Sequence, residues 1–359
     1  MNSPLCKVAD ILFVRFEVTD LQAQKEFLQH FGMRLAKETA DSIYFRGNGI
    51  APFIYVASQG IANRYISSGY YVNAFSDLEN LARDTGVEII ESQEPGGGQK
   101  VTLSDPDGMG VEVFFGVALD AAAASDAPPL NSGFDKSRVN ELQRIGKGAD
   151  EWVLENNDWR YALKSKVLRL GHIAVNVADP EASLKWYQNT LGYLISDNLG
   201  GPDGSRIGAF MRCDQGDAPV DHHAMNFIGA APGKEEFAGT FGHAGYELTE
   251  SVDDLMAGHF HLKTLGKYVH EWGIGRHLLG SQMYDYWRDP HGFTLEHWTD
   301  GDLLDASVPA NDSPIRDTVM AQYGPLVPSS FGLSMPSDEV ETYRADNPGF
   351  TDMVKLLER

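Results

Sequence analysis

Cysteine is scarce in this sequence, and its scarcity excludes two classes of protein. Only Cys6 and Cys213 occur among the 359 residues. Two cysteines so far apart do not supply the disulfide framework of a small secreted domain or a thiolate cage around a metal ion. We therefore predict that both thiols are reduced and take no part in the chemistry.

Long apolar runs and excess positive charge are also lacking. No stretch approaches the roughly 20 apolar residues needed to cross a bilayer, and the first residues lack the pattern of a secretory signal peptide. The chain carries 29 Lys and Arg against 51 Asp and Glu, a formal net charge of -22. Such a charge repels phosphate backbones and anionic lipids. We expect a cytoplasmic globular protein with no nucleic-acid or membrane partner.

Histidine is nearly absent from the first half of the chain. His30 is alone before residue 172, and the other ten histidines lie between His172 and His297. The length fits two domains of roughly 150 residues with connecting segments. The residues after Gly116 are small and turn-rich, which predicts an interdomain connection, and those after Asp300 are rich in Pro, Ser and Asp, which predicts an irregular surface tail. The chemistry is therefore expected in the second half.

The two halves look like diverged copies of one unit. Residues 13–36 and 172–195 each read as an alternating strand, an Asp and a helix that ends near Gly. Residues 104–116 and 288–300 each place an Asp-Pro-x-Gly turn before an alternating strand. In this pairing Glu112 corresponds to Glu296, but Phe13 takes the place of His172. The first copy keeps the frame and lacks the histidine.

Strand periodicity places three potential metal ligands on polar faces, because side chains alternate sides along a strand. His172 begins the strand 172–177, His243 lies in 242–249 and Glu296 lies in 293–298. Two imidazoles and one carboxylate can occupy one face of an octahedral ion and leave three positions open, as in non-haem Fe(II) oxygenases. Taken singly, each residue is more often structural: a hydrogen-bonded strand histidine, or a solvated strand glutamate.

The order of these residues within "LGHIAVNVADP", "GHAGYEL" and "DPHGFTLEHW" resembles the type I extradiol ring-cleavage dioxygenases of the vicinal oxygen chelate superfamily. The resemblance implies an α+β fold with two vicinal oxygen chelate domains, each made of paired βαβββ modules that form an incomplete barrel. It implies a metal-free N-terminal domain (1–117), a linker (118–166), a catalytic domain (167–302) and a C-terminal tail that packs on the domains (303–359). It also makes His172, His243 and Glu296 the ligands of Fe(II), with Mn(II) as the alternative.

Three further residues are implied by the same resemblance. "DHHAMNF" supplies an acid–base histidine on a strand, where the alternation favours His223 over His222. "GIGRHLLGSQMYDYW" matches the family's Gly-Arg-His segment and the Tyr that follows, so that His277 and Tyr286 would stabilise charge on substrate oxygens. A packed structural histidine, a loop histidine and a buried tyrosine are the alternatives. Residues 322–331, "QYGPLVPSSF", resemble the family's C-terminal Trp-Gly-Pro segment, with Tyr323 in place of Trp, and we expect them to close over the pocket.

The remaining histidines have simpler interpretations. His259, His261 and His270 fall in a predicted helix and its exit, where solvated or core roles are expected. His297 lies on its strand opposite to Glu296 and is not expected to bind the same ion. Arg276 is expected to pair with a substrate anion, with a carboxylate next to the metal ligands or, at least as readily, with an ordinary surface carboxylate.

The resemblance implies an extradiol dioxygenase of aromatic hydrocarbon catabolism. Such an enzyme cleaves a catechol-type ring beside its hydroxyls and incorporates both atoms of O2, and the segment 275–303 looks closest to the catechol 2,3-dioxygenase and trihydroxytoluene oxygenase-like branch. A small aromatic diol is then the expected partner, and a homo-oligomer is expected because the family usually forms one. Two other classes compete. One is a metal-dependent isomerase or lyase of the same superfamily, which commonly uses four protein ligands, and the other is a non-catalytic small-molecule binding protein.

Overall fold

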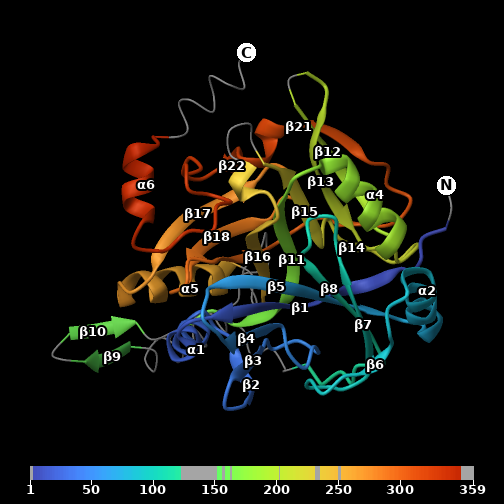
Figure 1. Cartoon of the computed structure of the whole chain (residues 1–359). Coiled ribbons are helices and arrows are strands. Elements are labelled where there is room, and N and C mark those ends of the chain that lie inside the picture. The colour runs from blue at the N-terminus through green and yellow to red at the C-terminus, as the bar shows by residue number, and fades with distance from the viewer. Residues whose placement is uncertain are drawn as a thin grey trace, which may run out of the picture.

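The computed structural model describes residues 3–122, 152–155, 158–161, 164–201, 203–230, 235–249 and 252–348. Two large sheets dominate it, one from each half of the chain, and the two halves lie against one another (Figure 1). A short hairpin of β9 (Trp152–Glu155) and β10 (Asp158–Tyr161) lies in the predicted linker, whose residues 123–151 are outside the described residues. Among the helices described, none combines the length and the apolar character that a membrane span requires.

The N-terminal half repeats one unit twice. The two units share the order strand, helix, three strands, and they meet at the centre of an eight-stranded sheet of order β2-β3-β4-β1-β5-β8-β7-β6. The first consists of β1 (Val8–Val18), α1 (Leu21–His30), β2 (Arg34–Glu38), β3 (Ser42–Arg46) and β4 (Tyr55–Gln59). The second consists of β5 (Arg64–Val72), α2 (Phe75–Thr85), β6 (Ile90–Glu91), β7 (Gln99–Ser104) and β8 (Gly110–Phe115).

The C-terminal half has the same plan. Its first unit consists of β11 (Val167–Val177), α4 (Pro180–Leu191), β12 (Leu194–Gly200), β13 (Arg206–Arg212) and β15 (Met225–Gly229). Its second consists of β16 (Thr240–Leu248), α5 (Val252–Leu265), β17 (Val269–His277), β18 (Met283–Arg288) and β19 (Thr294–Thr299). The ten-stranded sheet has the order β21-β12-β13-β15-β11-β16-β19-β18-β17-β22, and a separate pair joins β14 (Val220–Asp221) to β20 (Leu303–Leu304). The predicted α+β fold of paired βαβββ modules is confirmed.

The sequence signals at the start of this half have direct physical counterparts. Asp179 caps α4 by accepting hydrogen bonds from the backbone N–H groups of Glu181 and Ala182, and Pro180 occupies the first turn, where no backbone donor is needed. The helix ends at Gly192, whose φ of 77° is the left-handed conformation that glycine adopts without a steric penalty. On β11 the alternate residues Ile173, Val175 and Val177 are buried in the same apolar core as Leu184 and Leu191 of the helix.

The C-terminal segment is more regular than its composition predicts. β21 (Asn311–Pro314) adds to the sheet beside β12, and β22 (Ala321–Tyr323) pairs with β17. A helix, α6 (Val340–Asp346), follows. The prediction of an irregular tail was wrong for these elements, because edge strands of the sheet supply backbone partners that a local pattern of Pro, Ser and Asp does not reveal.

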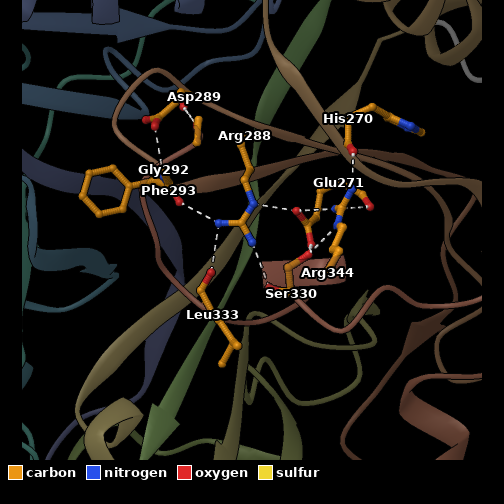
Figure 2. A network of polar contacts seen from close by, with 10 residues as sticks. His270, Glu271, Arg288, Asp289, Gly292, Phe293, Ser330, Leu333 and Arg344 are labelled. Carbon is orange, nitrogen blue, oxygen red and sulfur yellow. Dashed lines mark hydrogen bonds and ion pairs between the residues drawn. The ribbon is translucent and has the colours of Figure 1, made fainter. Parts of the chain in front are cut away.

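A buried polar network fixes this segment against β17 and β18 (Figure 2). The Arg288 guanidinium and the Glu271 carboxylate are both fully buried, with Nε 2.5 Å from Oε2. Arg288 also donates to the carbonyl oxygens of Ser330 and Leu333, at 2.8 and 3.0 Å. Arg344 of α6 reaches the same Glu271 oxygen at 2.8 Å. One arginine of the sheet thus holds the tail in place.

Candidate metal centre

Three neighbouring strands bring the predicted ligands together. β11, β16 and β19 are adjacent in the sheet, and their register aligns His172 with Gly245 and Gly245 with Glu296. His243 lies two residues before Gly245 on the same face of β16. His172 Nε2 is 2.9 Å from Glu296 Oε2, and His243 Nε2 is 3.7 Å from the same oxygen. One ligand atom from each residue lies within 4.8 Å of the other two.

Gly245 makes room for this convergence. A Cβ at this position would stand 2.2 Å from His172 Cε1 and 2.8 Å from Glu296 Oε2. Both distances are shorter than carbon and oxygen atoms tolerate, so any side chain would displace the ligands. Glycine is therefore required at position 245 by the space that His172 and Glu296 occupy, and not by the backbone conformation.

The carboxylate of Glu296 is poised for a cation. Its side chain is fully buried, and neither oxygen has a hydrogen-bond partner with good geometry among the described residues. Burial alone would raise the pKa of Glu296, but its interactions with His172, and then with His277 and His243, lower it below its ordinary value. Burial also lowers the pKa of His243 to about 3, so its imidazole is neutral and able to ligate. A buried carboxylate beside the neutral imidazole of His243 and the ring of His172 fits a divalent metal.

His223 lies beside the ligands, whereas His222 lies behind it. The two residues occupy the connection between β14 and β15 and not a strand, so the expected strand placement was wrong. The His223 ring centroid is 4.2 Å from that of His172. His222 Nδ1 is 3.1 Å from His223 Nδ1, and His222 Nε2 is 2.6 Å from Oδ2 of Asp197 on β12. Burial lowers the pKa of His223 well below its ordinary value, so this imidazole is neutral.

This chain of contacts determines which nitrogen of His223 carries the proton. The pKa of Asp197 is lowered: burial acts against this, but the hydrogen bond with His222 outweighs it, together with bonds from Asn311 and Ser313. An ionised carboxylate accepts hydrogen bonds only, so His222 must donate from Nε2. When the His222 ring carries this single proton, its Nδ1 accepts, and His223 must donate from Nδ1. The lone pair of His223 is therefore at Nε2.

His277 and Tyr286 form a second polar pair beside the ligands. Tyr286 is opposite Glu296 in the β18–β19 register. Its hydroxyl is 2.9 Å from His277 Nε2, which is itself 3.8 Å from Glu296 Oε1. Burial and the neighbouring Glu296 charge raise the pKa of Tyr286 well above its ordinary value. The tyrosine therefore keeps its proton and acts as a hydrogen-bond donor.

Two aromatic residues that the sequence did not single out line the same region. Phe331 of the C-terminal segment lies with its ring centroid 4.9 Å from Tyr286 and 5.8 Å from His243. Trp272 of β17 stacks on Tyr286 at 5.6 Å and touches Phe331 at 4.9 Å. Phe331 ends the stretch that resembles a pocket-closing segment, which was the available signal. Nothing in the sequence pointed to Trp272 or to Asp197.

The other histidines and Arg276 lie apart from this centre. His297 Nε2 is 2.7 Å from the carbonyl oxygen of Phe31, on the opposite side of β19 from Glu296. Arg276 pairs with the exposed Asp300 at 2.7 Å, which is the surface ion pair among its three predicted roles. His259 and His270 both contact Asp285.

The corresponding positions of the N-terminal half contain different residues. Strand register aligns Phe13 with His172, Ser67 with His243 and Glu112 with Glu296. Glu112 is not left for a cation there: it accepts hydrogen bonds from Ser67 Oγ at 2.6 Å, Lys100 Nζ at 2.6 Å and Arg15 Nε at 3.0 Å. In this copy, the positive charges of Lys100 and Arg15 thus occupy the position that a metal ion would take beside Glu296.

A known protein family matches the C-terminal half, which contains the candidate metal centre. Residues 169–297 match the family described as the Glyoxalase/Bleomycin resistance protein/Dioxygenase superfamily. These residues form a domain of that superfamily. The matched range contains all six predicted site residues, and it begins on β11 and ends on β19.

Alignments with two related proteins cover most of the chain. Metapyrocatechase 2 of Cupriavidus necator is 24% identical over 317 residues, which cover 88% of each chain. An iron-dependent extradiol dioxygenase of Rhodococcus jostii is 24% identical over 315 residues, covering 82% of this chain and 90% of that protein.

Two solved structures share the fold. A Mn(II)-bound glyoxalase from Novosphingobium aromaticivorans has a TM-score of 0.70 and 21% identity, covering 93% of this chain and 97% of its own. An extradiol ring-cleaving dioxygenase from B. fuscum has a TM-score of 0.68 and 17% identity, covering 94% of this chain and 84% of its own.

Proposed function

We propose that this chain is a metal-dependent extradiol dioxygenase that opens a catechol-type ring beside its hydroxyls and incorporates both atoms of O2. The observation that carries this proposal is the convergence of His172, His243 and Glu296, with two carboxylate oxygens that no described residue satisfies. The names of two relatives, a metapyrocatechase and an extradiol dioxygenase, point to the same reaction.

We assign Fe(II) to this site, held by His172, His243 and Glu296. The donor set also suits Mn(II), the ion named for the glyoxalase neighbour, whereas one relative is named as iron-dependent. When bound, a divalent redox-active metal makes the diol hydroxyls more acidic and passes electron density from the ring to dioxygen.

His223 is the acid–base residue of the proposal. Its lone pair at Nε2 is available at neutral pH, because burial suppresses protonation of the ring. His223 takes the proton of a diol hydroxyl at Nε2 and returns it to the opened product. His222 and Asp197 keep the other nitrogen protonated throughout.

His277 and Tyr286 bind the substrate oxygens. The Tyr286 hydroxyl keeps its proton and can turn from His277 towards an oxygen on which negative charge develops. Trp272 and Phe331 cover this pair with rings and limit the access of water. The aromatic wall also suits a flat ring as substrate.

The test uses anaerobic protein loaded with Fe(II) and, separately, with Mn(II). 4-Methylcatechol and then 18O2 are added, and the yellow ring-opened product is followed by absorbance and its mass. The proposal expects a product that contains two heavy oxygen atoms. Glu296→Gln should abolish metal retention and turnover, whereas Glu112→Gln, the matched change in the N-terminal copy, should keep both if the variant remains folded.

A metal-dependent isomerase is the second candidate, because a structural neighbour is a glyoxalase. That class commonly uses four protein ligands, and the group found here contains three within the described part of the chain. Turnover of methylglyoxal with glutathione, together with no oxygen uptake from catechols, would replace the dioxygenase proposal. A cytoplasmic location and a homo-oligomeric state stay predictions.

A further inference from the structure

A second group of metal-ligating side chains lies outside the centre described above. It consists of His259 on α5, His270 on β17 and Asp285 on β18. His270 Nε2 is 2.8 Å from Asp285 Oδ1, and His259 Nδ1 is 3.1 Å from the same oxygen. One ligand atom of each lies within 4.8 Å of the other two, as in the central group.

Strand alternation separates this group from the central one. Asp285 and Trp287 point to one side of β18, whereas Tyr284 and Tyr286 point to the other side, towards Trp272 and His277. The second group therefore lies between the sheet and α5, which runs beside β18 (Figure 1). A ligand bound there would not contact Glu296 or the proposed substrate.

Asp285 is oriented as a metal-binding carboxylate is. Its side chain is fully buried, and Trp287 donates from Nε1 to Oδ2 at 2.6 Å. Oδ1 faces both imidazoles, and His259 Nδ1 lies between the two oxygens, 3.1 Å from Oδ1 and 3.2 Å from Oδ2. Burial alone would raise the pKa of Asp285, but hydrogen bonds from His259 and His270 lower it, so the carboxylate is ionised.

The His270 side chain connects the group to solvent, and Arg344 contacts the His270 backbone. This side chain is 33% exposed, compared with 11% for His259. Arg344 contacts the backbone carbonyl of His270, and in Figure 2 the imidazole points away from the Arg288 network. An ion therefore has a path from solvent to a carboxylate that is otherwise enclosed.

We propose that His259, His270 and Asp285 form a second site for a divalent transition metal, with Zn2+ as the ion that this donor set favours. Two imidazoles and one carboxylate are a common ligand set for zinc, with solvent able to complete a tetrahedron. Donor atoms of a tetrahedral zinc lie about 3.3 Å apart for bonds of about 2.0–2.1 Å. The two contacts with Oδ1, 3.1 Å for His259 and 2.8 Å for His270, are shorter than that spacing by at most about half an ångström, so a small outward movement of the side chains would admit the ion.

Occupancy of this site would join three elements that are separate in the chain. The ion would tie α5 to the β17–β18 hairpin, which also supplies His277 and Tyr286 on its other side. Because these ligands converge only in the folded chain, bound Zn2+ would stabilise the native state and raise the melting temperature. Its role is thus structural and does not depend on the proposed ring-cleavage activity.

The test counts metal ions in the folded chain after Zn2+ is added and unbound metal is dialysed away. Wild-type protein should retain two equivalents, and a His172→Ala/His243→Ala variant should retain one. His270→Gln should retain one, in the central site, and should weaken Zn2+ binding at the second site by about 100-fold or more, since even changes beside metal ligands cost 10–100-fold. His291→Gln is the matched control and should retain two.

Two results would overturn the proposal. One is a single equivalent in the wild type with none in the His172→Ala/His243→Ala variant. The other is an unchanged stoichiometry in His270→Gln, which would show that the group is a hydrogen-bonded cluster without an ion. If Asp285→Asn fails to fold, the comparison of wild type with His270→Gln still decides, because that histidine is partly exposed. Loss of the central ion alone would count against the proposed function and leave this second site intact.

Discussion

His222 Nδ1 lies 3.1 Å from His223 Nδ1, so one histidine sets the protonation pattern of the next. Only one of these two nitrogens can carry the shared hydrogen while both rings are neutral. Asp197 determines which one, because its carboxylate accepts a hydrogen bond from the N–H at His222 Nε2. The proposed acid–base residue, His223, is thus controlled from strand β12, which carries none of the proposed metal ligands.

Asp197→Asn should reverse this pattern. The Asn amide can donate to His222 Nε2, which moves the His222 proton to Nδ1 and leaves His223 protonated at Nε2, where it cannot act as a base. We expect kcat for catechol cleavage to fall by about 100-fold, within the range of general acid–base catalysis, with little change in KM. The measurement is steady-state kinetics over a range of pH. Asp312→Asn, an exposed change on the neighbouring strand, is the control, and equal kcat values in both variants would contradict the tautomer argument.

Tyr286→Phe tests the second polar pair. The change removes a hydroxyl 2.9 Å from His277 Nε2 and keeps the ring that packs on Trp272 and Phe331. Loss of one donor to developing charge should lower kcat by about 100-fold. Tyr284→Phe is a matched control, because the Tyr284 hydroxyl has no hydrogen-bond partner among the described residues. If both variants lose the same activity, the hydroxyl of Tyr286 has no special role.

The stability of the chain should fall at mildly acid pH because of His297. Burial lowers the pKa of this histidine from 6.5 to about 4, so the proton binds the unfolded chain more tightly than the folded one. Stability is therefore complete above the unfolded pKa and is lost as pH falls towards the folded pKa. Between about pH 7.5 and about pH 5, His297 should account for a loss of about 2 kcal/mol in the free energy of unfolding. Urea unfolding of wild type and His297→Gln measures it, and an identical pH dependence in both would refute the assignment.

Arg288→Met should destabilise the C-terminal segment. The substitution leaves the buried Glu271 with Arg344 as its remaining basic partner and removes the donors to Ser330 and Leu333. Breaking a buried ion pair from one side costs about 3–5 kcal/mol. We expect a fall of that size in the free energy of unfolding, and earlier proteolysis within the segment. Arg344→Ala, at a side chain 30% exposed, should cost clearly less. Equal costs would contradict the network.

The sequence predicted those features that depend on local pattern. The alternation of side chains on β11 and β19 predicted the face of each strand on which His172 and Glu296 lie in the structure. The duplicated turn and strand units predicted the repeated modules. The convergence itself follows from strand order, which the resemblance supplied and which spacing alone does not determine.

Other parts of the site depend on contacts between distant segments. Asp197 contacts His222 from strand β12, and Phe331 comes from the C-terminal segment. His259 and His270 were assigned solvated or core roles, because nothing near them in the sequence marks Asp285 as their common partner. The histidine pair was expected on a strand, yet it lies in a connection where two consecutive side chains both turn inward.

The position of His297 beside Glu296 has a consequence for dividing the chain. One strand carries the metal-site carboxylate on one side and, on the next residue, an imidazole locked to the Phe31 carbonyl and stacked on the Phe31 ring at 3.7 Å. Separating the halves would expose that ring and release the strand at the residue next to Glu296. An isolated C-terminal half would thus keep all three proposed ligands and lose the contact with Phe31 that holds the residue next to Glu296 in position.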